Sequence, residues 1–275
     1  LTFNYTIGAG ENASDLDYTV TSSLALNSGT IKDAALNAAT LTLASPGATN
    51  SLGANKALII DTTVPTVMDV TSTTANGSYK QGDVIAITVG FNEVVNVTGT
   101  PQLTLETGSS DAVVDYSSGS GSNTLTFNYT IGAGENASDL DYTVTSSLAL
   151  NSGTIKDAAL NAATLTLASP GAVNSLSANK GILVDGTVPT VADVSSTASN
   201  GSYKAGNVIP ITVEFSELVN VTGTPQLSLK IKRNGTTVGD GEASVWTGSS
   251  KIFTKENDTN PTIESNQDRI TDKVW

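Results

Sequence analysis

The sequence predicts an all-β protein built from tandem antiparallel sandwich modules, and three observations lead to this class. Residues 1–48 recur without change at 125–172. Short runs of alternating apolar and polar residues are separated by Gly, Pro, Asn and Ser, the pattern of half-buried strands joined by turns. Aromatic content is only 5% within a hydrophobic content of 38%, so the cores are expected to consist mainly of Val, Ile, Leu and Ala.

The repeat sets the length of a module. Each residue from Leu1 to Leu105 is matched by the residue 124 positions later, with scattered substitutions after residue 48. This period exceeds the roughly 20–50 residues of solenoid repeats. Each unit is therefore expected to be an independent domain in an array.

Two proline-containing linkers mark the expected module boundaries. Pro65 and Pro189 each follow a short apolar run and an aspartate. Proline fixes φ and cannot donate to a strand ladder, so it suits a junction. We expect 62–185 to be one complete module, 1–61 the C-terminal half of a preceding module, and 186–275 a third module whose C-terminal part, 230–275, diverges from the repeat.

Within the complete module, strands are expected where β-branched residues cluster, as at 84–89, or where apolar residues alternate with polar ones, as at 102–105, 112–116 and 125–130. These runs are 67–71, 84–89, 102–105, 112–116 and 125–130. Seven or more short strands at such spacing indicate a sandwich with Greek-key connections. Residues 158–163 are rich in Ala, but the neighbouring Thr and Asn argue against a helix.

The divergent segment 230–275 has a different composition. Asn234-Gly235 lies between two strand-like runs and predicts a hairpin turn. The segment also holds Trp246 and Trp275, the two tryptophans of the chain. It is interpreted either as the remainder of a variant module or as a tail with a function of its own.

Charge and composition exclude several functions. The formal net charge is −13, so nucleic acid and anionic lipid are not expected partners. No run approaches the roughly 18 apolar residues of a membrane span, so membrane insertion is not expected. The chain has neither His nor Cys, which removes a Ser-His-Asp triad and thiolate metal sites. We do not expect an enzyme.

Carboxylates near the linkers are the candidate metal ligands. Antiparallel pairing of 67–71 with 84–89 brings Glu93 beside Asp61, and by the same logic Glu217 beside Asp185. Asp157, in a late turn, is the third candidate at the first junction. Such an oxygen-rich set suits Ca²⁺. The alternative is that Asp61 and Asp157 only cap turns through local hydrogen bonds.

The motifs in this order resemble a known family. They are Asp-Thr-Thr-Val-Pro, Asn-Gly-Ser-Tyr-Lys-x-Gly-Asp, Phe-x-Glu, Val-Thr-Gly-Thr-Pro-Gln-Leu-Thr-Leu and Gly-Thr-Ile-Lys-Asp-Ala-Ala. They resemble tandem Ig-like repeats of giant bacterial surface proteins and type I-secreted adhesins, over residues 1–229. The resemblance implies an Ig-like sandwich, export to the bacterial cell surface, and a spacer or adhesive role. Where that family usually has glycine after Asp-Ala-Ala, this chain has Leu160.

Three functions remain open from the sequence. The leading expectation is a structural spacer that projects a binding region from the cell, because near-identical repeats let length change without new interfaces. The first alternative is a subunit of an extracellular filament or surface layer, assembled with other copies by strand complementation. The second is a carbohydrate-binding module that contacts cell-surface glycans through Trp246.

Residues 1–61 are not expected to be stable alone. They carry only the later strands of a sandwich, and half a core does not offset the entropy of ordering the chain. Either preceding residues of a longer array complete this half, or the end of one chain completes the start of the next.

Overall fold

The computed structural model describes residues 1–233 and 236–243. The chain separates into two compact units, Leu1–Thr187 and Val188–Trp275, and each is described by itself. Trp246, Trp275 and the rest of the segment after Ala243 lie outside the described residues, as does the predicted Asn234-Gly235 turn. The secondary structure is almost entirely strand, and the all-β class predicted from the sequence is confirmed.

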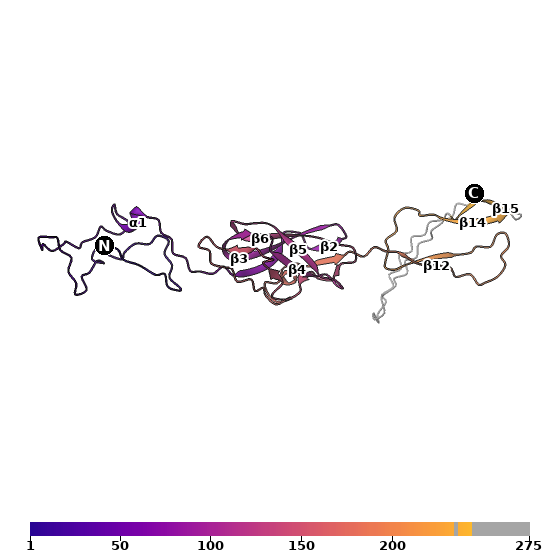
Figure 1. Ribbon diagram of the computed structural model, residues 1–275. Coiled ribbons are helices and arrows are strands. Elements are labelled where there is room, and N and C mark those ends of the chain that lie inside the picture. Colours follow the sequence, from indigo (N-terminus) through magenta and orange to yellow (C-terminus); the bar gives the residue numbers. More distant parts are fainter. Residues whose placement is uncertain (234–235, 244–275) are drawn as a thin grey trace. The chain divides into compact units, whose positions relative to one another are not determined.

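Residues 62–187 form the strand-rich part of the first unit (Figure 1). All five runs predicted as strands are strands. The strands are β1 (Val67–Ser72), β2 (Gly77–Lys80), β3 (Val84–Thr98), β4 (Gln102–Glu106), β5 (Ala112–Ser118), β6 (Ser122–Thr130), β7 (Asn136–Ala137), β8 (Asp141–Tyr142), β9 (Leu148–Ala149), β10 (Thr154–Lys156) and β11 (Ile182–Asp185). The Ala-rich stretch 158–163 is not helical, as predicted.

The main sheet has the order β1-β3-β6-β5-β4-β8, with β10 on β3 and β9 on β4. All of these pairs are antiparallel. One pair departs from the predicted antiparallel pattern, because β11 runs parallel to β2 in a second sheet, β2-β11-β7. Gly77 is the first residue of β2, so the connection from β1 to β3 contains a strand that belongs to the second sheet.

The main sheet and β11 surround one hydrophobic core, which gives the module a β-sandwich-like character. The fully buried side chains come from alternate positions of the strands, as the period of two requires. They include Ile85 and Ile87 of β3, Leu103 of β4 and Phe127 of β6. The Phe127 ring meets the Tyr116 ring edge-to-face at 6.1 Å between centroids.

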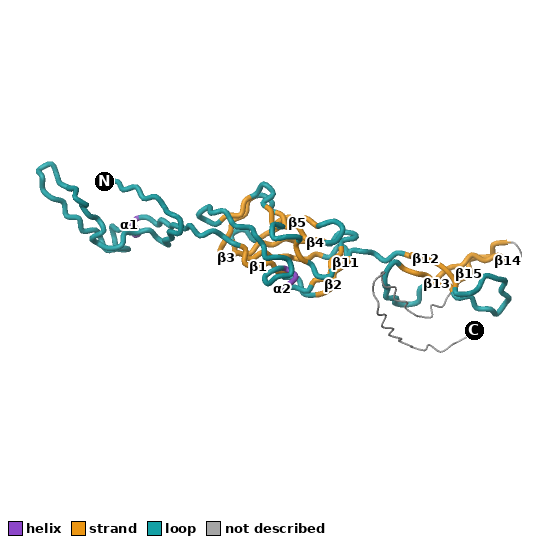
Figure 2. The backbone as a smooth tube through the Cα atoms, turned by 90° about the horizontal axis from the view of Figure 1, so that it is seen from below, coloured by secondary structure: helices purple, strands orange, loops and turns teal. Residues whose placement is uncertain are grey.

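Residues 1–61 contain no strand, although residues 1–48 are identical to 125–172, which form β6 to β10. Figure 2 shows this region as loop apart from one short helix, α1 (Leu52–Asn55). The physical reason is that the partners of β6 and β10 are strands of 62–124, and no equivalent segment pairs with 1–61. Ladder hydrogen bonds and core contacts are then missing together.

The second unit begins with two antiparallel strands, β12 (Val191–Ser196) and β13 (Ile211–Phe215). A second hairpin follows, made of β14 (Leu227–Arg233) and β15 (Thr236–Ala243). These strands lie where the sequence predicts a hairpin, and Arg233 pairs with Thr236.

Helices are short in the described part of the chain. They are α1 and its repeat counterpart α2 (Leu176–Asn179), each capped by a serine side chain that accepts from the third backbone N–H. Neither helix has the length and apolarity needed to cross a membrane.

Candidate metal site at the first linker

Three of the predicted ligands meet at the linker before β1. Asp61, Glu93 and Asp157 each offer a carboxylate oxygen, and these oxygens all lie within 4.8 Å of one another. Asp157 is buried at 3% exposure, whereas Asp61 and Glu93 are partly buried. Among the described residues this is the one group of three or more potential ligands with such spacing.

The bend in β3 positions Glu93. Ladder pairing with β6 runs regularly from Val84 to Gly90 and resumes only at Val95. Glu93 lies in this irregular stretch, just beyond the Val67–Phe91 pair that begins the ladder with β1. Irregularities of this kind re-aim a side chain out of the regular pleat. Glu93 thus reaches the linker that precedes β1.

Asp157 approaches from the other direction and directly follows β10. Thr154, Ile155 and Lys156 pair with Thr98, Val97 and Asn96 in antiparallel register. The next residue, Asp157, therefore continues along β3 toward Glu93. The sequence suggested that Asp157 lies at this pole, and the β10–β3 ladder supplies the reason.

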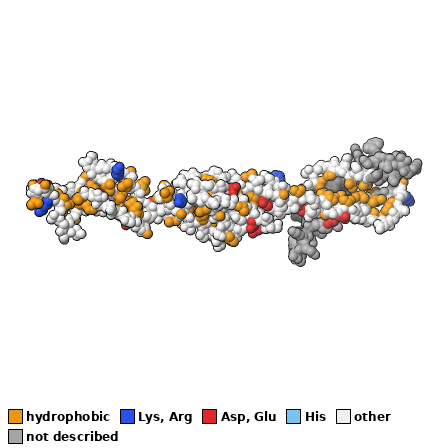
Figure 3. All heavy atoms as spheres, in the orientation of Figure 1, with side chains coloured by type: hydrophobic (Ala, Val, Ile, Leu, Met, Phe, Trp, Pro, Cys, Tyr) orange, Lys and Arg blue, Asp and Glu red, His pale blue; other side chains and the backbone are white. Residues whose placement is uncertain are grey.

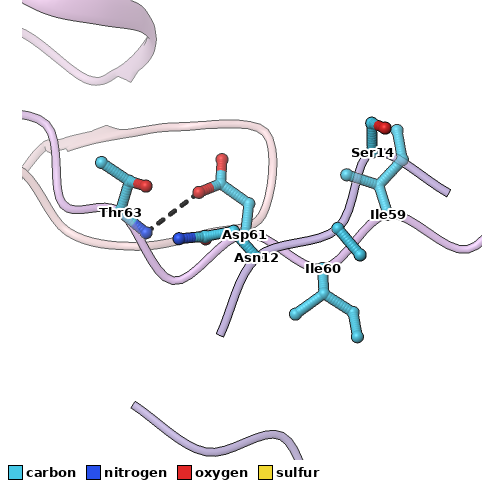
Figure 4. Close-up of a pocket in the computed structure, with 7 residues that line it drawn as sticks. Asn12, Ser14, Ile59, Ile60, Asp61 and Thr63 are labelled. Atoms are coloured by element: carbon cyan, nitrogen blue, oxygen red, sulfur yellow. Dashed lines mark hydrogen bonds between the residues drawn. The ribbon is translucent and has the colours of Figure 1, made fainter. Parts of the chain in front are cut away.

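Two of the carboxylates also hold local turns. The Thr63 N–H donates to Asp61 Oδ1 at 2.9 Å (Figure 4). Asp157 accepts from Asn161 twice, from the backbone N–H at 2.8 Å and from Nδ2 at 2.7 Å. The turn-capping alternative is therefore present in the structure. It does not exclude ion binding, because a carboxylate oxygen has a second lone pair.

Glu93 is the carboxylate whose burial is not offset by a hydrogen bond or by a neighbouring positive charge. Its Oε1 atom is buried and has no hydrogen-bond partner. Burial, followed by the charges of Asp61 and Asp157, raises the pKa of Glu93 above its ordinary value. In the described part of the chain the one salt bridge is Lys80–Asp83, so no Lys or Arg neutralises the three carboxylates. Such a site favours a cation.

The spacing of the cluster fits a calcium ion. Ca²⁺ binds oxygen ligands at about 2.3–2.6 Å, so two ligands on opposite sides of one ion are about 4.6–5.2 Å apart. Oxygens within 4.8 Å of one another can therefore all contact a single ion. Three carboxylates provide part of the roughly six to eight oxygen ligands that Ca²⁺ takes, and water or backbone carbonyls would supply the others.

Two asparagines belong to the site although the sequence did not single them out. Asn161 Nδ2 donates to the Asp61 carbonyl at 2.9 Å as well as to Asp157, so it ties the late turn to the linker. Asn92 holds Thr66, accepting its N–H at 2.7 Å through Oδ1 and donating its own N–H to the Thr66 carbonyl. A signal was present for Asn92, which lies beside Glu93 in the Phe-x-Glu motif, whereas Asn161 lies four residues after Asp157 and outside the quoted motifs.

The second junction repeats part of this geometry. Asp185 Oδ1 accepts from the Thr187 N–H, as Asp61 does from Thr63, and Glu217 Oε1 is buried without a partner, as in Glu93. Asp185 and Glu217 belong to different units. That Glu217 lies beside Asp185 therefore stays a prediction.

A shallow hollow lies next to Asp61, with a volume of about 320 Å³. Asn12, Ser14, Ile59, Ile60 and Thr63 help to line it, and the Asp61 carboxylate points toward Thr63 and away from Ile60 (Figure 4).

Comparison with protein families, with curated proteins and with solved structures finds no match to this chain.

Proposed function

We propose that this chain is a structural spacer of an extracellular bacterial surface adhesin, built from tandem Ig-like sandwich modules with a period of 124 residues. Its role is mechanical and not enzymatic: the modules hold a binding region away from the cell. The repeat and the two proline linkers support a modular array, and the antiparallel main sheet with its single core supports the sandwich.

The observation that carries the proposal is the position of the acidic cluster. Asp61 belongs to the linker, whereas Glu93 and Asp157 belong to the module that follows. A divalent cation held by all three would fix the direction in which the linker leaves the module. We propose that Ca²⁺ does this and so stiffens the junction.

Thermal melting tests the calcium step. An ion that binds only the folded state stabilises it by about 2.7 kcal/mol at a hundredfold excess over Kd. The melting temperature of the chain is therefore expected to rise in millimolar Ca²⁺ and to fall again with chelator. Glu93→Gln should abolish the rise, and Asp111→Asn, which changes an exposed carboxylate outside the cluster, should preserve it.

Solution scattering tests the spacer step. With Ca²⁺ the maximum dimension of the full chain should increase and its distribution should narrow, because a fixed linker samples fewer directions. If neither the melting temperature nor the maximum dimension responds to chelator, calcium is not a structural partner. Single, unbranched rods in electron micrographs of the native material would support the spacer, and ordered polymers would contradict it.

A further inference from the structure

The chain enters and leaves the complete module at opposite ends of β3. Val67, where β1 begins, pairs with Phe91. Asp185, the last residue of β11, pairs with Lys80, which precedes the turn into Val84 at the other end of this part of β3. Figure 2 shows the chain entering the module on the side of β3 and leaving past β11 on the other side. Tension applied through the two linkers therefore acts along β3.

The first of the two terminal strands, β1, runs along this axis and is held on both edges. Its ladder with β3 extends from Val67 to Ser72. On the other edge, the Val70 N–H donates to the Asn174 carbonyl, and the Val70 carbonyl accepts from Asn179 Nδ2. A pull on the linker before β1 slides this strand along its partners. The hydrogen bonds of the ladder then share the load and do not break one after another.

The second terminal strand, β11, lies between two partners at the other end of the module. It pairs in parallel with β2 along its whole length, and in antiparallel orientation with β7 at Val184 and Asp185. A pull on the linker after β11 slides this strand between β2 and β7. Both ladders are therefore loaded in shear, as the ladder between β1 and β3 is.

Gly186 extends these contacts beyond the end of β11. Its N–H donates to the Glu135 carbonyl at 2.7 Å, and its carbonyl accepts from the Gly134 N–H at 2.9 Å. A β-carbon at residue 186 would overlap the Gly132 carbonyl oxygen and lie 2.7 Å from the Glu135 carbonyl oxygen, so this close approach requires glycine. The loop that receives Gly186 is itself fixed, because Glu135 Oε2 accepts from the Tyr129 hydroxyl at 2.7 Å and from the Gly132 N–H at 2.6 Å.

Ion pairs add little to the resistance of the module. In the described part of the chain the one salt bridge joins Lys80 and Asp83 within a single turn. Figure 3 shows only scattered charged side chains on the visible face of the module. The load instead passes through the backbone ladders and the core, in which Val70 of β1 and Val184 of β11 are buried. Sliding either terminal strand therefore also exposes buried apolar side chains to water, which is unfavourable.

We propose that the complete module bears tension, that β1 and β11 are its shear-loaded strands, and that Gly186 strengthens the attachment of β11. Such a role deepens the spacer function proposed above and rests on it, because a spacer is loaded whenever the region that it projects is held by a surface. Forced unfolding is governed by the unfolding barrier. A load that a whole ladder shares crosses this barrier only at high force, whereas a load that opens the ladder pair by pair crosses it at low force.

Single-molecule force spectroscopy tests the proposal in the full chain, which has no native cysteine. In the shear geometry, the handles are attached through Thr63→Cys and Val188→Cys, just outside the two terminal strands. In the unzipping geometry, they are attached through Gln81→Cys and Val188→Cys. Gln81 follows Lys80, the partner of Asp185, so this pull separates β11 from β2 pair by pair. All three handle positions are exposed, and chelator is present throughout so that calcium does not contribute.

The shear geometry should require about twice the unfolding force of the unzipping geometry or more at one loading rate, because the two variants differ only in where the load is applied. Gly186→Thr, which introduces the residue found at Thr62 of the first copy, should lower the force in the shear geometry. The matched control is Gly181→Ala, which likewise introduces the residue of the first copy, Ala57. It should leave the force unchanged, because a β-carbon there meets only Asn76 Nδ2, at 4.0 Å.

Equal unfolding forces in the two geometries would overturn the proposal. A Gly186→Thr chain that resists as much force as the Gly181→Ala chain would remove the role of Gly186. Should Gly186→Thr fail to fold, Gly186→Ala, which adds only the β-carbon, takes its place. A low force in both geometries leaves the calcium response and the solution dimensions of the spacer untouched, so failure of this proposal is distinguishable from failure of the proposed function.

Discussion

Residues 1–48 and 125–172 have one sequence and two structures. Local hydrogen bonds are the same in both: the Tyr5 hydroxyl donates to Glu11 and the Tyr129 hydroxyl to Glu135, and Asp33 holds Asn37 as Asp157 holds Asn161. The serine-capped helix also forms in both copies. The strands form only in the second copy.

The difference separates two kinds of information in the chain. Turns and caps depend on residues a few positions apart, so an identical sequence gives an identical result. A strand needs a partner for its ladder and a core for its apolar face. The strands β6, β8, β9 and β10 find their ladder partners in 62–124, which also supplies many of the buried core residues. Residues 1–61 therefore form the turns of a module but lack the strand ladders and core contacts that would stabilise it.

The largest expected effect comes from dividing the chain at its first linker. Residues 62–187 contain all strands from β1 to β11 and should fold alone, with a β-type far-UV circular dichroism spectrum and a cooperative melt. Residues 1–61 alone should show neither. A random-coil spectrum for 62–187 would refute the assigned boundary, and a cooperative melt for 1–61 would remove the contrast between the copies.

Phe127 and its repeat counterpart Phe3 provide the next comparison. Phe127→Ala should lower the free energy of unfolding of the complete module by about 3–5 kcal/mol, because it deletes a fully buried ring. Phe3→Ala, measured at a concentration where chains are monomeric, should change it by less than about 0.5 kcal/mol. Urea denaturation of the full chain measures both values. Should Phe127→Ala prevent folding, Phe127→Leu gives a milder test in the same direction.

A smaller effect is expected at Leu160, where the family that the sequence resembles usually has glycine. Leu160 has φ 73°, in the left-handed region, and is exposed. A β-carbon in that region costs about 1–2 kcal/mol, part of which glycine loses again through its freer unfolded chain. Leu160→Gly should therefore stabilise the module by about 1 kcal/mol.

The first copy supplies the control for this substitution. Leu36 has φ 70°, but its region should not take part in the cooperative melt, so Leu36→Gly should leave the melting temperature unchanged. Ala159→Gly, next to Leu160 and without positive φ, should lower it. Equal shifts for Leu160→Gly and Leu36→Gly would mean that both halves melt together.

The smallest effect is the pH dependence due to Glu93. Its pKa is raised in the folded state, so between the unfolded pKa, about 4.3, and the raised value the folded state binds more protons. Stability from this group is then greatest at low pH and is lost as pH rises through that window. In chelator, Glu93→Gln should reduce this loss. A variant with the same pH profile as the wild type would show that Glu93 is not strained by its neighbours.

The sequence was sufficient for the strands that alternate most clearly. The runs at 67–71 and 84–89 are rich in β-branched residues, and their pairing follows from chain order. The parallel β2–β11 pair could not be foreseen, because Gly77–Lys80 has too little apolar pattern to reveal a partner about a hundred residues away. The loss of strands in 1–61 depends on absent partners and not on its own residues.

The site was predicted to a similar extent. Asp61 and Glu93 follow from antiparallel pairing of neighbouring strands, and the structure brings them together with Asp157. The bend in β3 that aims Glu93 leaves no signal in a run of Val, Asn and Glu. The link from Asn161 to the Asp61 carbonyl joins residues far apart in sequence, which local patterns do not reveal.

The shortness of the first linker has a consequence for folding. While the chain folds, β3 meets two competing partners of identical sequence, 1–6 and 125–130. If β3 paired with residues 1–6, Asp61 would occupy the place of Asp185 beside Lys80. The chain would then have to return from there to Val67 beside Phe91. That return exceeds the length of β3 from Val84 to Phe91, about 24 Å at ~3.4 Å per residue. The extended linker from Asp61 to Val67 spans at most about 22 Å. The short linker thus makes β3 pair with residues 125–130 and not with the identical residues 1–6. A few residues inserted between Asp61 and Val67 would let a circularly permuted module form.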